Sequence, residues 1–171
     1  MATTCKLIAK NVLGGSTSSV TFGSIPATFD DLWLMATARS DRSASDGDTI
    51  KARFNGAAND ANLSTRGLYA YTTPQSQSLS EARIGLACST GHTSNTFAST
   101  EVYIPNYAGS TNKSMSSFAT TEDNTTTNSL IAVYASLWQD TSAITQITMF
   151  PGYGTNFVTG SSFYLYGIKK A

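Results

Sequence analysis

Charged side chains are scarce in this sequence of 171 residues, at 13% of the total, about half of the roughly 25% usual in soluble proteins. Eleven basic residues balance eleven acidic ones, so the formal net charge is zero. This balance argues against a nucleic-acid binder, which needs a basic surface to neutralise phosphates, and against a polybasic membrane anchor. Apolar runs such as Leu130–Tyr134 fall far short of the roughly 18 residues that span a bilayer.

Thiol and imidazole groups are equally scarce, because Cys5, Cys88 and His92 are the whole inventory. Zinc needs four ligands, so a zinc site is excluded. We expect two separate, reduced and buried thiols, although the sequence leaves a Cys5–Cys88 disulfide open. His92 lies among Ser, Thr and Gly, which indicates an exposed turn rather than a catalytic base. Nucleophile elbows and phosphate-binding glycine loops are absent, so we predict that the protein is not an enzyme and binds no cofactor.

Hydroxyl groups stand where charge is missing, since the sequence contains 25 Thr and 23 Ser. Thr fits a pleated, half-exposed surface and Ser suits turns, so this composition predicts an all-β protein. Soluble monomers usually carry net charge that opposes association. A neutral, hydroxyl-rich surface therefore favours a protein that is held in an assembly.

Alternation of apolar and polar residues recurs along the whole chain, and no segment has a helical period. Turn residues separate the alternating segments at the spacing typical of a sandwich or barrel. We predict a single domain, residues 1–171, folded as an antiparallel two-sheet β-sandwich of about ten strands with jelly-roll-like connections. The expected strands are Cys5–Val12, Ser19–Phe22, Asp31–Arg39, Thr49–Asn55, Gly67–Thr72, Glu81–Cys88, Thr96–Ile104, Lys113–Thr121, Ser129–Trp138, Ala143–Phe150 and Phe163–Ile168.

Two segments between these strands carry specific expectations. Thr73–Ser80 is rich in Pro, Gln and Ser and is predicted to be a loop. The Asp/Gly-rich segment Asp41–Asp48 is predicted to be a plain turn, with Asp41, Asp46 and Asp48 as weak candidates for metal ligands. A hard cation needs six to eight oxygen ligands, and this segment lacks the bidentate Glu that completes a calcium loop.

Contacts with a ligand or a partner are expected at polar strands and at aromatic loops. Lys113–Thr121 is a polar strand and is predicted to be a sheet edge, which needs a partner or a cover. Tyr107 and Tyr153 each lie beside Pro or Gly and are the best exposed candidates for stacking on a sugar. The full set of candidate interface or ligand residues is Tyr103, Pro105, Asn106, Tyr107, Lys113 and Tyr153.

Several stretches, taken together and in order, resemble segments of small β-rich virion proteins of tailed bacteriophages, notably aquatic ones. The two longest are residues 101–114, EVYIPNYAGSTNKS, and residues 163–169, FYLYGIK. Shorter ones are residues 25–32, IPATFDDL, residues 53–56, RFNG, and the pair Leu137 and Trp138.

The resemblance implies a structural protein of a phage particle that is assembled in the host cytoplasm. A capsid decoration, or cement, protein on the outer head surface is expected first, with the major capsid protein as its partner and a homo-oligomer, preferably a trimer, as its state. Lack of a coiled-coil or β-helical shaft argues against a fibre. A tail fibre or baseplate component that binds host-surface glycan is the alternative, and a free carbohydrate-binding module is the third possibility.

Overall fold

A computed structural model describes residues 4–43, 47–70, 73–125 and 129–170. The described residues form twelve β-strands. No helix among the described residues is long and apolar enough to span a membrane. The strands are β1 (Cys5–Val12), β2 (Val20–Phe22), β3 (Asp31–Ala38), β4 (Asp48–Phe54), β5 (Leu63–Ala70), β6 (Pro74–Leu79), β7 (Ala82–Ala87), β8 (Ala98–Pro105), β9 (Lys113–Thr121), β10 (Leu130–Trp138), β11 (Ile147–Pro151) and β12 (Ser162–Ile168).

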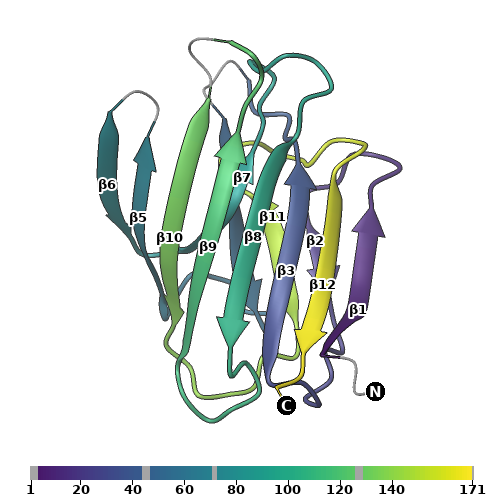
Figure 1. Cartoon of the computed structure of the whole chain (residues 1–171), viewed down its shortest axis with the longest axis vertical. Helices are drawn as coiled ribbons and strands as arrows, with labels where there is room; N and C mark the ends of the chain where they lie inside the picture. Colours follow the sequence, from purple (N-terminus) through teal and green to yellow (C-terminus); the bar gives the residue numbers. More distant parts are fainter. Residues whose placement is uncertain (1–3, 44–46, 71–72, 126–128, 171) are drawn as a thin grey trace.

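The strands form two antiparallel sheets that face each other (Figure 1), which confirms the predicted all-β, two-sheet fold. The large sheet has eight strands in the order β1-β12-β3-β8-β9-β10-β5-β6. The small sheet has four strands in the order β2-β11-β4-β7. The part of the large sheet formed by β9, β10, β5 and β6 covers β7, the edge strand of the small sheet, through β9 and β10 and extends beyond it to β6. We call this part the overhang.

The chain passes repeatedly from one sheet to the other. Strands β1 and β3 belong to the large sheet, whereas β2 and β4 belong to the small sheet. The chain crosses again between β7 and β8 and between β11 and β12. The paired strands β5 and β6, and likewise β9 and β10, are neighbours in the chain and together make the overhang. The overhang is thus two pairs of strands added to eight others, of which β1 to β4 alternate between the sheets whereas β4 and β7 pair within the small sheet.

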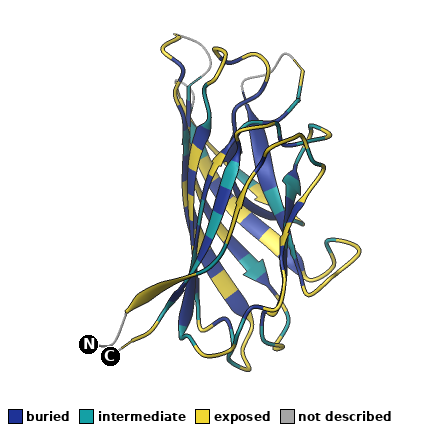
Figure 2. Ribbon diagram, turned by 90° about the vertical axis from the view of Figure 1, so that its right-hand side faces the viewer, coloured by how far each residue is buried: buried dark blue, intermediate teal, exposed yellow. Residues whose placement is uncertain are grey.

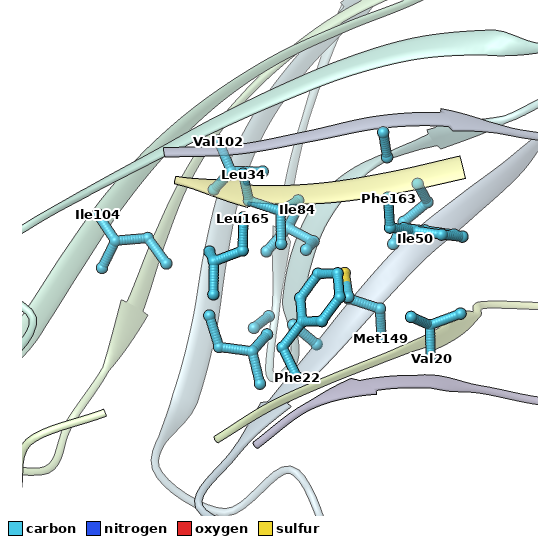
Figure 3. Close-up of a cluster of buried hydrophobic side chains, with 14 of the residues drawn as sticks. Val20, Phe22, Leu34, Ile50, Ile84, Val102, Ile104, Met149, Phe163 and Leu165 are labelled. Atoms are coloured by element: carbon cyan, nitrogen blue, oxygen red, sulfur yellow. The ribbon is translucent and has the colours of Figure 1, made fainter. Parts of the chain in front are cut away.

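The core lies between the two sheets and follows from the alternation in the sequence. Figure 2 shows buried and exposed residues alternating along the strands. Side chains from both sheets meet in the core (Figure 3): Val20, Phe22, Ile50, Ile84 and Met149 come from the small sheet, and Leu34, Val102, Ile104, Phe163 and Leu165 from the large sheet. Removal of such side chains from water, worth about 1.5–3 kcal/mol each, is the main force that holds the sheets together.

Hydroxyl groups cover the free edge of β7, where backbone groups of the small sheet have no neighbouring strand. Thr65 Oγ1 of the overhang accepts a hydrogen bond from the Arg83 amide at 3.0 Å, and Ser136 Oγ donates to the Arg83 carbonyl at 2.9 Å. Thr100 Oγ1 accepts from the Leu86 amide at 3.1 Å. These buried hydroxyls satisfy backbone groups that would otherwise be costly to bury. Part of the unusual Thr and Ser content therefore closes a sheet edge inside the protein.

Two expectations about individual segments are wrong. Lys113–Thr121 is not a sheet edge, because β9 lies between β8 and β10 and pairs with both. Thr73–Ser80 is not a plain loop, because Pro74–Leu79 forms β6, the true edge of the overhang. The sequence PQSQSL does not alternate, so pairing with β5 alone makes it a strand.

Candidate functional site: an apolar sheet face and a polar cleft

The outer face of the large sheet exposes a row of apolar side chains. Phe118 of β9 pairs with Val133 of β10, which in turn pairs with Leu68 of β5. These three side chains are 50%, 49% and 60% exposed. Ile131 lies next to Val133 on the same face of β10 and is 55% exposed. Because residues two apart in a strand share a face, these four side chains form one surface patch.

The row continues toward the other end of the large sheet. Across from Phe118 lies Glu101, and beyond it the register places Met35 and Tyr164. The neighbouring row contains Tyr103, Trp33 and Tyr166, with the Trp33 and Tyr166 ring centroids 6.0 Å apart. We call the surface formed by Leu68, Phe118, Ile131 and Val133 with Trp33, Met35 and Tyr103 the outer apolar face. A hollow of about 300 Å³ lies in it, lined by Trp33, Tyr103, Phe118 and Val133 among others.

The segment around Tyr103 is anchored at one end of this face by a buried carboxylate. Asp31, which is fully buried, accepts hydrogen bonds from the Tyr103 hydroxyl at 2.5 Å and from the Asn106 amide at 2.9 Å. Lys170 forms an ion pair with it at 3.0 Å. Burial alone would raise the pKa of Asp31, but these bonds outweigh burial and lower that pKa below 3.8. Three of the candidate contact residues are thus held by Asp31: Tyr103 and Asn106 through hydrogen bonds, and Pro105 as its cross-strand neighbour in the sheet.

Two of the expected contact residues are buried and are not available to a partner. Tyr107 is fully buried, and its hydroxyl donates to the Pro26 carbonyl, so the expectation of an exposed ring is wrong. Lys113 is also fully buried, and its ammonium group donates to the Thr111 carbonyl. Burial lowers the pKa of Lys113. Both side chains are therefore part of the protein interior.

Tyr153 is 59% exposed, as expected, and stands at the mouth of a polar cleft. The Arg42 guanidinium lies 4.3 Å from the centre of its ring, and Arg83 donates to its hydroxyl at 3.1 Å. The cleft has a volume of about 200 Å³ and runs between the outer side of β7 and the overhang. It is lined by Arg42, Gly47, Asp48, Thr49, Tyr69, Gln77, Arg83, Leu86, Leu130, Tyr134 and Tyr153.

Two of the three candidate metal ligands instead hold the loop that carries Tyr153. Asp48 accepts hydrogen bonds from the amides of Tyr153 at 3.0 Å and Gly154 at 2.9 Å. Asp41 accepts from the amides of Thr155 and Asn156, and despite burial these bonds lower the pKa of Asp41. Asp46, the third candidate, lies outside the described residues. Among the described residues, no group of three or more His, Cys, Asp or Glu side chains is placed to hold a metal ion.

The cysteines and the histidine differ in part from expectation. Cys5 and Cys88 are both free thiols, but Cys5 is exposed, so the prediction that both are buried is wrong. Burial raises the pKa of Cys88 to about 11, which keeps this thiol protonated and unreactive near neutral pH. His92 is also buried, contrary to the expected surface position, and its Nδ1 accepts from the Ser89 amide at 3.1 Å.

Of the residues that line the cleft, only Tyr153, as a contact residue, and Asp48, as a weak candidate for a metal ligand, were predicted from the sequence. Arg42, Thr49 and Arg83 come from three separate segments. Thr49 and Arg83 are at strand positions that face away from the core, yet each is only 6% exposed. A polar residue on an outward strand position is normally solvated. Here the loop with Gly152 and Tyr153 packs against both residues, since the Gly152 amide donates to the Thr49 carbonyl and Arg83 donates to the Tyr153 hydroxyl. No local pattern in the sequence shows such a long-range contact.

No protein-family model, no curated protein and no solved structure matches this chain. The resemblance to phage virion proteins therefore stays a prediction, and function has to be argued from the outer apolar face and the polar cleft.

Proposed function

We propose that this protein is a structural component of a bacteriophage virion, and that it acts as a capsid decoration protein. In this proposal it binds the major capsid protein on the outer surface of the head and stabilises the joints between capsid subunits. No chemical reaction is involved. Many copies on the capsid lattice, each with a moderate interface, together resist expansion of the shell.

The observation that carries this proposal is the outer apolar face. Large apolar patches that stay exposed on a soluble protein are typical of sites that bind another protein. Phe118, Val133 and Leu68 contribute such a patch from three adjacent strands, and only one charged residue, Glu101, lies in their row between β12 and β5. A sheet face that carries few charges, Glu101 and the flanking Arg66, fits a contact with a fixed capsid wall, because side chains held on paired strands lose little order on binding.

Two further observations support the proposal. Strands β1 to β4 alternate between the two sheets, and the chain crosses again between β7 and β8 and between β11 and β12; such crossings fit a jelly roll, a fold common in viral capsid proteins. The formal net charge of zero also fits a protein that spends its life in an assembly rather than free in solution.

Contacts between copies, such as those of a trimer, need a different location from the one expected. Lys113–Thr121 lies inside the large sheet, so it cannot supply an edge. The outermost strands of that sheet are β1 and β6. Strand β6 has no charged residue, and Pro74 is its only residue of a kind that hinders an edge strand from pairing with another chain. We therefore assign any edge contact between copies to β6.

A glycan-binding component of the tail is the second candidate, and the polar cleft favours it. Tyr153 and the arginines around it offer the aromatic and hydrogen-bonding groups that recognise sugars. The two candidates differ in where the protein is found in the particle.

Sedimentation of tail-less particles separates the two candidates. DNA-filled heads that lack tails are purified next to isolated tails, and the protein is quantified in both by mass spectrometry. We expect it on the heads, in a fixed ratio to the major capsid protein. Its absence from the heads and presence on the tails would overturn the proposal in favour of the tail component.

A further inference from the structure

We propose that the polar cleft is a binding site for an acidic sugar, a saccharide residue that bears a carboxylate. This inference does not depend on capsid attachment, because a decoration protein and a tail component could both carry such a site. It rests on three properties of the cleft within the described part of the chain: an arginine without a carboxylate partner, a buried guanidinium with an unused edge, and a buried hydroxyl that has no hydrogen-bond partner.

Arg42 supplies the positive charge that would bind the carboxylate. It stacks on Tyr153 and donates to the Gly47 carbonyl at 2.5 Å, but it forms no ion pair within the described part of the chain. Among the described residues, the carboxylates in and next to the cleft, those of Asp41, Asp48 and Glu81, are already engaged, Asp41 by the amides of Thr155 and Asn156. Asp48 accepts from loop amides, and Glu81 forms ion pairs with Lys51 at 2.5 Å and Arg83 at 2.9 Å. The positive charge of Arg42 is therefore available to a ligand.

Arg83 offers a second set of donors deeper in the cleft. It is 6% exposed, and its Nε and Nη2 atoms donate to Glu81, with Nη2 also donating to the Tyr153 hydroxyl. None of its hydrogen bonds to other described residues uses Nη1. Since Glu81 and Tyr153 fix the plane of the guanidinium, this free edge is held ready for an oxygen of a ligand.

Thr49 is the observation that points most directly to a ligand. It is 6% exposed and lines the cleft, and its Oγ1 atom has no hydrogen-bond partner among the described residues. Buried polar atoms are nearly always paired, so an unpaired one at the wall of a cavity marks a place for a bound polar group. A Cβ atom at Gly152 would lie 2.0 Å from this oxygen, so only glycine leaves room beside it.

The size and lining of the cleft select the class of ligand. Its volume of about 200 Å³ is below the roughly 300–1,000 Å³ of pockets for drug-sized molecules, so it admits about one sugar ring. Gln77 and the hydroxyl of Thr49 suit the alcohol groups of such a ring, while Tyr69 and Tyr134 provide walls for its apolar edges. Arg42 and Arg83 would then bind the single carboxylate of an acidic sugar.

Titration with monosaccharides tests this site. Glucuronate and galacturonate are added to the full chain at low ionic strength and followed by NMR, with glucose and galactose as neutral equivalents and inorganic phosphate as a bare anion. We expect the two acids to bind with dissociation constants of the order of millimolar and the neutral sugars at least about tenfold more weakly. Equal binding of neutral and acidic sugars, or phosphate binding as tightly as the acids, would overturn the assignment.

Three variants locate the binding. Arg42→Gln should weaken binding of the acids about tenfold or more. Arg53→Gln is the matched control, because Arg53 also stacks on an aromatic ring, Phe150, at 4.8 Å but lies outside the cleft. Thr49→Val should weaken binding about two- to tenfold and at the same time raise the melting temperature, since it removes an unpaired buried hydroxyl. Unchanged affinity in both Arg42→Gln and Thr49→Val would refute the site.

Discussion

The double substitution Phe118→Glu and Val133→Lys should reduce binding of the protein to phage heads at least about a hundredfold. Each of these side chains is half exposed in the free protein and becomes buried in the proposed interface. Full burial of a large apolar side chain is worth about 1.5–3 kcal/mol, so burial of the exposed half contributes about 0.8–1.5 kcal/mol, and burial of an introduced charge adds about 1–3 kcal/mol or more. Two such losses exceed the roughly 2.8 kcal/mol that corresponds to a hundredfold change in affinity. Binding is measured by sedimentation with stripped heads.

The pair is chosen so that folding is preserved. Phe118 and Val133 lie directly opposite each other on β9 and β10, so the introduced charges of opposite sign attract each other. The matched control is Thr21→Glu with Thr148→Lys, a cross-strand pair of β2 and β11 whose hydroxyls are 3.0 Å apart. This control should bind heads normally. Normal binding by the first variant would contradict the proposed role of the outer apolar face.

Replacement of Asp31 by alanine should lower the free energy of unfolding by about 3 kcal/mol at neutral pH. Asp31 is fully buried, accepts hydrogen bonds from Tyr103 and Asn106, and forms an ion pair with Lys170. Hydrogen bonds to a charged group contribute about 1.5–3 kcal/mol, and their loss leaves the Asn106 amide without its partner. For a chain of this length, the melting temperature should fall by about 6–12 °C. Chemical and thermal unfolding followed by circular dichroism measure both quantities.

The effect of this substitution should depend on pH in a defined direction. The folded state lowers the pKa of Asp31 below 3.8, so the carboxylate contributes its full stability above the unfolded pKa and loses it as pH falls through the folded pKa. Unfolding free energies of the native protein and of Asp31→Ala should therefore converge in acid. Lys170→Ala removes only an exposed partner, 63% exposed, and should destabilise the protein much less than Asp31→Ala does. A constant difference between native protein and Asp31→Ala down to pH 2 would refute this role of the carboxylate.

Strands were the part of the fold that the sequence predicted best. Lys113–Thr121 forms a strand with the expected ends, because alternation along a strand directly reflects which face is buried. Cys5–Val12 also has the expected ends, although it is exposed along most of its length. The order of strands in a sheet leaves no such local pattern. The outward positions of β9 include Ser114 and Ser116, so the strand looks like a polar edge although it lies between two neighbours.

Candidate site residues were harder to predict, because burial in loops depends on contacts far away in the chain. Tyr107 and Tyr153 both lie in turns rich in Pro or Gly, and both seemed equally exposed. Only the structure distinguishes them, since the Tyr107 hydroxyl reaches Pro26 whereas the Tyr153 loop is held outward by Asp41 and Asp48. Apart from Tyr103, the residues of the outer apolar face were not predicted as contact residues, since an apolar side chain carries no local sign that its face of the sheet is left uncovered.

The central claim is that the outer apolar face is covered in the virion, and side-chain footprinting of intact particles tests it most directly. Hydroxyl radicals label exposed side chains of the free protein and of the particle-bound protein, and mass spectrometry gives the labelling of each residue. We predict strong protection of Phe118, Leu68 and Tyr103 in the particle, whereas Tyr153 in the loop after β11 remains labelled. Equal labelling of Phe118 and Leu68 in the free and bound protein would contradict the claim.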